Sequence, residues 1–188
     1  MLRLTSSLPL IVSYVLQIKA NMLGPGVWSL TSLDKCSIEL KEEIITLDLY
    51  KHKLNRTHDG ISADGDFLND IGDNYGALVE ICRFVDGGCK PSQVLSDNSV
   101  ANMIRQYGSK ENIINALTLA NIDPPEFPIP KGKYHVDDFM IDYCKLPRDG
   151  FYGKFEGVGY LMRGSDKVGC IKMVMEFNKF DDDNSCDD

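Results

Sequence analysis

The stretch that decides the fold is residues 151–180, FYGKFEGVGYLMRGSDKVGCIKMVMEFNKF. It contains two long segments, 151–163 and 167–180, on either side of Gly164-Ser165-Asp166. In the second segment apolar and polar side chains alternate, which is the pattern of a half-buried strand. The apolar face of that segment consists of Ile171, Met173, Met175 and Phe177. Two such segments around a glycine-containing turn predict an antiparallel hairpin with one apolar face.

Four other segments also carry strand patterns. Residues 42–50 alternate clearly, residues 60–68 alternate weakly, and residues 76–84 are rich in strand-forming side chains. Residues 133–146 change phase at Asp137-Asp138, which predicts a β-bulge there. Together with the hairpin, these segments predict a chain that is mainly β.

Between these strands the apolar period changes to that of a helix. Residues 96–107 predict one short helix, for which residues 96–98 (Ser-Asp-Asn) offer N-caps, and residues 110–120 predict a second helix capped by Ser109. The proline-rich residues 123–130 then form an extended segment. The fold class we expect is mainly β: an antiparallel β-sandwich or cup with a short helical insert.

The first twenty residues indicate export. Residues 1–20 combine Arg3 with an apolar run and the small residue Ala20, as signal peptides do, and NMLGPG at 21–26 disfavours the alternative of a buried N-terminal helix. We expect a single domain over residues 21–180 and an acidic, disordered tail over residues 181–188. The sequon at Asn55 predicts a glycosylated surface position in an exported chain.

Six cysteines follow the predicted signal peptide, and an even number in an exported chain indicates disulfides. Fifteen pairings can be drawn if all six are used. Spacing favours one bridge, between Cys82 and Cys89, because Asp86-Gly87-Gly88 can turn the chain between them.

Catalytic, metal and cofactor chemistry find little support in the sequence. His52, His58 and His135 stand in no recognisable catalytic frame, and the acidic residues 59–73 do not fit an EF-hand register. No Cys-x-x-Cys pair is present. The net charge of −8 disfavours nucleic acid as a partner. We therefore expect no enzymatic activity, no catalytic residue, no metal and no cofactor.

Apolar side chains are more informative than the polar ones. Gly153, Gly157 and Gly159 interrupt one predicted strand, where glycine marks bending or close approach by another group, and methionine adapts to varied apolar ligands. A curved, pliable sheet could surround an apolar ligand, although composition alone favours a filled sandwich core. The candidate cavity residues are Ile171, Met173, Met175, Phe177, Leu161, Met162, Phe155, Met103 and Ile104.

Two stretches carry a resemblance to a known family: FPIPKGKYHVDDFMIDYCKLP (127–147) and SDKVGCIKMVMEF (165–177). They resemble the ganglioside activator proteins, sphingolipid activators of the ML-like lipid-recognition group. The family's P-x-x-x-G-x-Y segment corresponds to Pro128, Gly132 and Tyr134, and its GCIK strand to residues 169–172. An early cysteine after a tryptophan, and a cysteine pair around six residues, also agree. The likeness is close over residues 128–177 only.

The resemblance implies disulfides Cys36–Cys170 and Cys82–Cys89 in a β-cup with a hydrophobic cavity and mobile helical loops at its mouth. This chain departs from the family in residues 90–143, which contain no cysteine, and in Cys144 and Cys186, which either pair with each other or stay free. An insect branch, the chemosensory proteins of the B type, is similar in length and plan.

The resulting expectation is a secreted, extracellular protein that binds a lipid or long-chain hydrophobic small molecule in insect chemosensation, such as pheromone response. A membrane surface or a receptor is a further partner to consider. The alternative is a glycolipid activator in the lysosomal lumen that presents ganglioside-like substrate to a hydrolase. A secreted interaction module with a filled core is a third interpretation.

Overall fold

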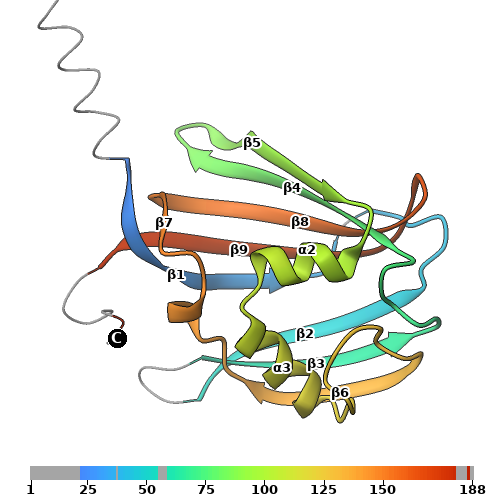
Figure 1. Cartoon of the computed structure of the whole chain (residues 1–188). Helices are drawn as coiled ribbons and strands as arrows, with labels where there is room; N and C mark the ends of the chain where they lie inside the picture. The colour runs from blue at the N-terminus through green and yellow to red at the C-terminus, as the bar shows by residue number, and fades with distance from the viewer. Residues whose placement is uncertain (1–21, 37, 55–58, 181–185, 187–188) are drawn as a thin grey trace, which may run out of the picture.

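Antiparallel strands dominate the computed structural model, which describes residues 22–36, 38–54, 59–180 and 186. The strands form two sheets that curl into a cup, with two short helices on the concave side (Figure 1). The mainly β, antiparallel fold class is thereby confirmed. The predicted signal peptide, the sequon at Asn55 and the tail beyond residue 180, Cys186 excepted, lie outside the described residues.

The larger sheet has six strands in the order β5-β4-β8-β9-β1-β7. Its strands are β1 (Leu23–Asp34), β4 (Gly76–Val85), β5 (Gly88–Asp97), β7 (Asp149–Phe151), β8 (Gly153–Arg163) and β9 (Asp166–Lys179). The predicted hairpin is confirmed as β8 and β9, which are joined at Gly164 with a φ of 61°. Strand β1 was not predicted, although it lies beside β9 and pairs Trp28 with Phe177.

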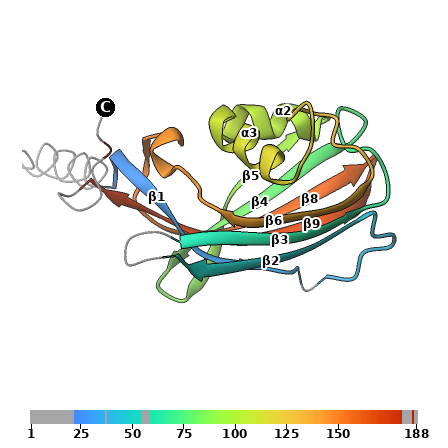
Figure 2. The same cartoon turned by 90° about the horizontal axis from the view of Figure 1, so that it is seen from below.

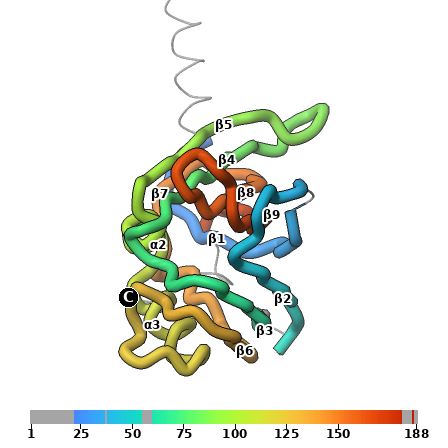
Figure 3. Tube along the Cα trace, turned by 90° about the vertical axis from the view of Figure 1, so that its right-hand side faces the viewer, coloured from blue at the N-terminus to red at the C-terminus, as the bar shows by residue number. Residues whose placement is uncertain are grey.

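The smaller sheet has the order β2-β3-β6. Its strands are β2 (Ile45–Lys53), β3 (Asp59–Phe67) and β6 (Gly132–Phe139). The predicted bulge is confirmed, because Asp137 and Asp138 lie between pairs that leave only Ser62 opposite them. Figure 3 shows the two sheets as walls that continue from β5 round to β6, with the helices beside their concave side.

Ile44, which precedes β2, is hydrogen-bonded through its backbone to both sheets: to Val168 of β9 in the larger sheet and to Leu68, which follows β3 of the smaller one. The Ile44 amide donates to the Val168 carbonyl at 2.9 Å, and the Leu68 amide donates to the Ile44 carbonyl at 2.9 Å. The side chains around this junction form a buried core cluster that consists of Ile44, Ile71, Tyr75, Leu161 and Val168. This cluster draws its side chains from the larger sheet and from the segments that flank β2 and β3, so its burial holds the two walls together.

Helices α2 (Val100–Tyr107) and α3 (Lys110–Leu119) follow the larger sheet's edge strand. Ser109 caps α3 as predicted, and its hydroxyl accepts from the Asn112 amide at 3.2 Å. The predicted caps for the first helix were wrong: Ser96 and Asp97 pair with β4, and Ser99 is the cap of α2. Pairing with β4 keeps Ser96 and Asp97 in a strand, although their local propensity favours the start of a helix. No described helix has the length and apolar character needed to cross a membrane.

Three disulfides join the described cysteines in pairs. Their Cα–Cα distances are 6.0 Å for Cys36–Cys170, 5.4 Å for Cys82–Cys89 and 5.6 Å for Cys144–Cys186. The first joins the end of β1 to β9, and the second joins β4 to β5. The short 3-10 helix η1 (Tyr143–Lys145) carries Cys144. Three disulfides are consistent with an extracellular or secreted protein.

Candidate functional site

An apolar cavity of about 420 Å³ lies between the two sheets and α2. Its volume is within the range of small-molecule sites. The larger sheet contributes Ala77, Val79, Gly157, Gly159, Tyr160, Leu161, Gly169, Cys170, Ile171 and Met173. The smaller sheet and the segment after it contribute Ile45, Leu47, Phe67 and Ile71. The helix and the proline-rich segment contribute Val100, Met103, Ile104, Phe127 and Ile129. Figure 2 shows α2 and α3 on the concave side of the strands.

Two glycines of β8 give the cavity its depth. Gly157 and Gly159 lie on the concave face, opposite Met173 and Ile171 of β9. A Cβ at Gly157 would meet Met173 Cγ at 3.8 Å, an ordinary contact distance, and a Cβ at Gly159 would meet Ile171 Cγ2 at 3.3 Å. A Cβ at Gly157 therefore has room, whereas one at Gly159 would require Ile171 to shift slightly, and any larger side chain at either position would project into the cavity.

Five of the nine residues predicted for the cavity line it. They are Leu161, Ile171 and Met173 of the hairpin and Met103 and Ile104 of α2. Met103 is 5% exposed and Leu161 is 8% exposed, so both also belong to the packed interior. Residues far apart in the sequence thus meet at one apolar surface.

Three other predicted residues lie on the concave face but not around the cavity. Phe177 is 0% exposed, and its ring centroid is 4.8 Å from that of Trp28 and 5.7 Å from that of Tyr152. The Phe155 ring centroid is 6.0 Å from that of Trp28, and Met175 pairs with Phe155 across the strands. These aromatic rings fill their end of the cup. Alternation predicts a face, but it does not separate the filled part of that face from the hollow part.

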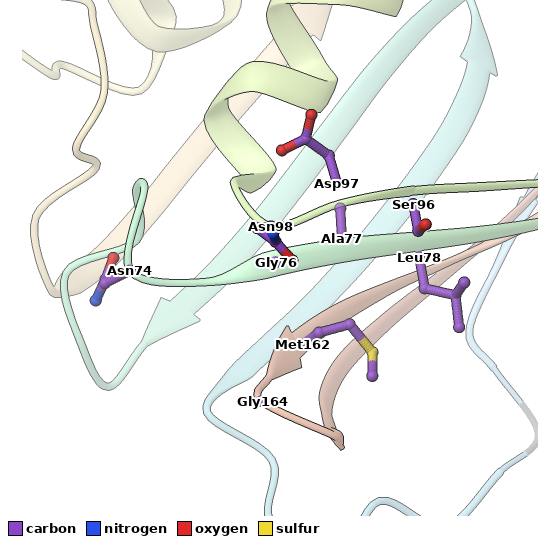
Figure 4. A pocket seen from close by; sticks show the side chains of 9 residues that line it. All are labelled: Asn74, Gly76, Ala77, Leu78, Ser96, Asp97, Asn98, Met162 and Gly164. Carbon is purple, nitrogen blue, oxygen red and sulfur yellow. The ribbon is translucent and has the colours of Figure 1, made fainter.

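Met162, the ninth residue, faces elsewhere because it follows Leu161 directly and successive side chains of a strand point to opposite faces. It lines a second hollow, of about 640 Å³, at the start of β4 (Figure 4). There Asp97 points toward the start of α2, while Leu78 and Met162 point to the opposite side. The Asp97 carboxylate accepts from the Ser99 amide at 2.7 Å. Because its side chains diverge and its carboxylate supports the helix cap, this hollow is a weaker ligand site than the apolar cavity.

Sequence reasoning did not identify the cavity residues that come from the smaller sheet or from the proline-rich segment. Alternation in residues 42–50 had placed Ile45 and Leu47 on a common face, and this signal identified their strand but not their neighbours. Phe127 had no periodic signal, because it lies in the proline-rich segment. The Arg105 guanidinium lies over the Phe127 ring at 5.7 Å from its centroid, which helps to hold the ring over the cavity.

The described histidines lie on the smaller sheet, away from the cavity lining. His135 Nδ1 is 2.8 Å from Asp64 Oδ1, and His135 Nε2 is 2.9 Å from Asp137 Oδ2. Hydrogen bonding to Asp64, and then to Asp137, raises the pKa of His135, and hydrogen bonding to His135 lowers the pKa of Asp137. His52 Nε2 is 2.7 Å from Asp138 Oδ1. These pairs brace the surface of β2, β3 and β6.

An arginine–glutamate ion pair lies near the junction of the sheets. Arg163 donates to both carboxylate oxygens of Glu42, at 3.3 Å and 2.5 Å. The Arg163 hydrogen bond lowers the pKa of Glu42, and the same contact raises the pKa of Arg163. Among residues 22–36, 38–54, 59–180 and 186, no cluster of three His, Cys, Asp or Glu side chains is arranged to hold a metal ion.

Comparison with known proteins found no family model that matches this chain, and no curated protein that matches it.

Proposed function

We propose that this protein is a secreted, non-enzymatic carrier that binds a lipid or another long-chain apolar molecule in the cavity beneath α2. The observation that carries the proposal is the cavity of about 420 Å³, whose floor is opened by Gly157 and Gly159. A sheet that only needed a filled core would place larger side chains at these two positions.

The lining supplies the binding energy through the hydrophobic effect. Each methylene group moved from water into such a site contributes about 0.8 kcal/mol. An apolar lining offers few polar partners for water, so a hydrocarbon chain is the occupant that it favours. Met103 and Met173, from opposite sides of the cavity, let the lining adapt to chains of different shape.

The biological setting in the proposal rests on the sequence resemblance. A role in chemosensation, with apolar chemical cues as ligands, is the leading setting. Presentation of a glycolipid to a hydrolase is the other. Adding the protein to a ganglioside-containing membrane and a lysosomal glycosidase separates the two, because only an activator increases the rate of hydrolysis.

The test of binding is native mass spectrometry of the secreted protein, before and after lipid extraction, with dodecan-1-ol added back. We expect one bound apolar molecule per chain. Gly157→Leu places a side chain in the cavity and should reduce binding by at least about tenfold, since several methylene contacts are lost. Val158→Leu, at the next residue on the opposite face of β8, is the matched control and should bind normally. No bindable apolar ligand in the wild-type protein would overturn the proposal.

A further inference from the structure

Arg83 is a cation on the concave, otherwise apolar face of the larger sheet. It follows Val79 and Ile81 on the same side of β4 and pairs with Phe155 of β8. Gly157, which opens the cavity, is the next residue of β8 on this face, about 7 Å from Phe155 along the strand. The guanidinium contacts Tyr152, Gly153 and Phe155, so it lies at the aromatic end of this face, and Phe155 stands between it and the cavity residue Gly157.

The described residues hold Arg83 in place without neutralising it. Its Nη2 atom donates to the Tyr152 carbonyl at 2.7 Å, and its Cζ atom lies 5.9 Å from the centroid of the Phe155 ring. Its Nε atom is buried and has no hydrogen-bond partner in the described part of the chain. No carboxylate within that part forms a salt bridge with it. A half-buried guanidinium without an anion is uncommon, because burial of a charge costs free energy unless it is paired.

The neighbouring charges on β8 have partners elsewhere. Glu156 forms a salt bridge with Lys172 at 2.9 Å on the outer face, and Lys154 lies over the Phe84 ring at 5.4 Å. Gly153 lies directly against Arg83, because a Cβ there would meet the Nε atom at 3.3 Å. The chain thus makes room for the guanidinium among apolar groups.

We propose that Arg83 binds the headgroup of an anionic amphiphile, a long-chain carboxylate whose hydrocarbon tail occupies the cavity. This inference rests on the proposed carrier function and adds a ligand class to it. A guanidinium matches a carboxylate in charge and in forked geometry, and the apolar surroundings strengthen the pair. The nearby cavity accepts the tail, so one ligand satisfies both features.

The test compares dodecanoate with dodecan-1-ol, which has the same chain length and no charge, by titration calorimetry at neutral pH. Wild-type protein should bind dodecanoate roughly 10- to 100-fold more tightly than the alcohol, the ratio expected for a charge-assisted hydrogen bond. Arg83→Met keeps the length and apolar character of the side chain and should remove this preference while it leaves alcohol binding unchanged. Arg83→Lys keeps the charge without the fork and should retain part of the preference.

The outcomes separate this inference from the proposed function. Equal binding of the two ligands by the wild-type protein overturns the Arg83 inference and leaves the carrier function intact. A preference for dodecanoate that persists in Arg83→Met also overturns it, since another group must then hold the carboxylate. Binding of neither ligand overturns both proposals. The wild-type comparison needs no variant, so it holds even if Arg83→Met fails to fold.

Discussion

The two ends of the concave face of β8 and β9 differ in what fills them. At one end the rings of Phe155 and Phe177 pack against Trp28, with centroids 6.0 Å and 4.8 Å from its own, and Phe177 is fully buried. At the other end Gly157 and Gly159 leave a cavity of about 420 Å³. Both ends belong to the same two strands and follow the same alternation of side chains. The volume of each inward side chain, and not the strand pattern, therefore decides whether the sheet forms a core or a binding site.

The filled end should be the more sensitive to truncation. Phe177→Ala should lower the free energy of unfolding by about 3–5 kcal/mol, because the ring is fully buried and an unfilled cavity replaces it. Urea denaturation with the disulfides intact measures this loss. Phe151→Ala is the control, since Phe151 is 56% exposed and should lose less than about 1 kcal/mol. Similar losses for the two variants would show that the aromatic end is not tightly packed.

Truncation of a side chain beside the cavity should lower the free energy of unfolding by less than truncation at the aromatic end. Met173→Ala, four residues before Phe177 on the same face of β9, should lower the free energy of unfolding by about 2 kcal/mol, the lower end of the range for truncating a core methionine, because Met173 is only half-buried. The side chain has the cavity on one side, so it loses fewer contacts. The same urea series provides the measurement. A loss as large as that of Phe177→Ala would contradict the difference between the ends.

Replacing either of the two glycines by alanine should change the free energy of unfolding by less than these truncations, and in the opposite direction. Gly157→Ala should raise the free energy of unfolding by about 0.4–1 kcal/mol, because alanine restricts the unfolded chain and its methyl group meets Met173 only at contact distance. Gly159→Ala should gain less, since Ile171 Cγ2 lies closer. Thermal and urea unfolding of both variants gives the ranking. Destabilisation by Gly157→Ala would mean that the hollow is narrower than the structure shows.

The smallest expected effect is a pH dependence of the free energy of unfolding, and it comes from His135 and Asp137 on β6 of the smaller sheet. The pKa of His135 is raised above 6.5 by Asp64 and Asp137, so its contribution to stability is complete below pH 6.5. That contribution is lost as the pH rises through the higher folded-state pKa. The lowered pKa of Asp137 adds stability above about pH 3.8, which is lost as the pH falls through the folded-state value. The side chains are well exposed, so the effect is small.

Titration of His135 by NMR should give a pKa above 6.5 in the folded protein. The stability difference between wild type and His135→Gln should be largest near pH 5 and should shrink toward pH 8. A difference that does not change with pH would show that the histidine pairs do not support this wall of the cavity.

Features that depend on neighbouring residues were predictable from the sequence. The β8–β9 hairpin, the bulge at Asp137-Asp138 and the cap at Ser109 each follow from a short pattern with a local physical cause. The Cys82–Cys89 bridge joins residues seven positions apart, and a turn lies between them. Strand β1 escaped prediction because its glycines, proline and small polar residues blur the alternation, and its pairing with β9 comes from the opposite end of the chain.

In the candidate site, too, local features could be predicted from the sequence and those that depend on distant segments could not. Local alternation was sufficient to place Ile171, Met173 and Phe177 on one inward face, because side chains on a strand alternate by geometry. It could not place the hollow, since that depends on which side chains from β1, β4 and α2 arrive opposite each position. Packing is a property of contacts between distant segments, so the separation of Met173 in the cavity from Phe177 in the aromatic end arose only when the sheets and the helix came together.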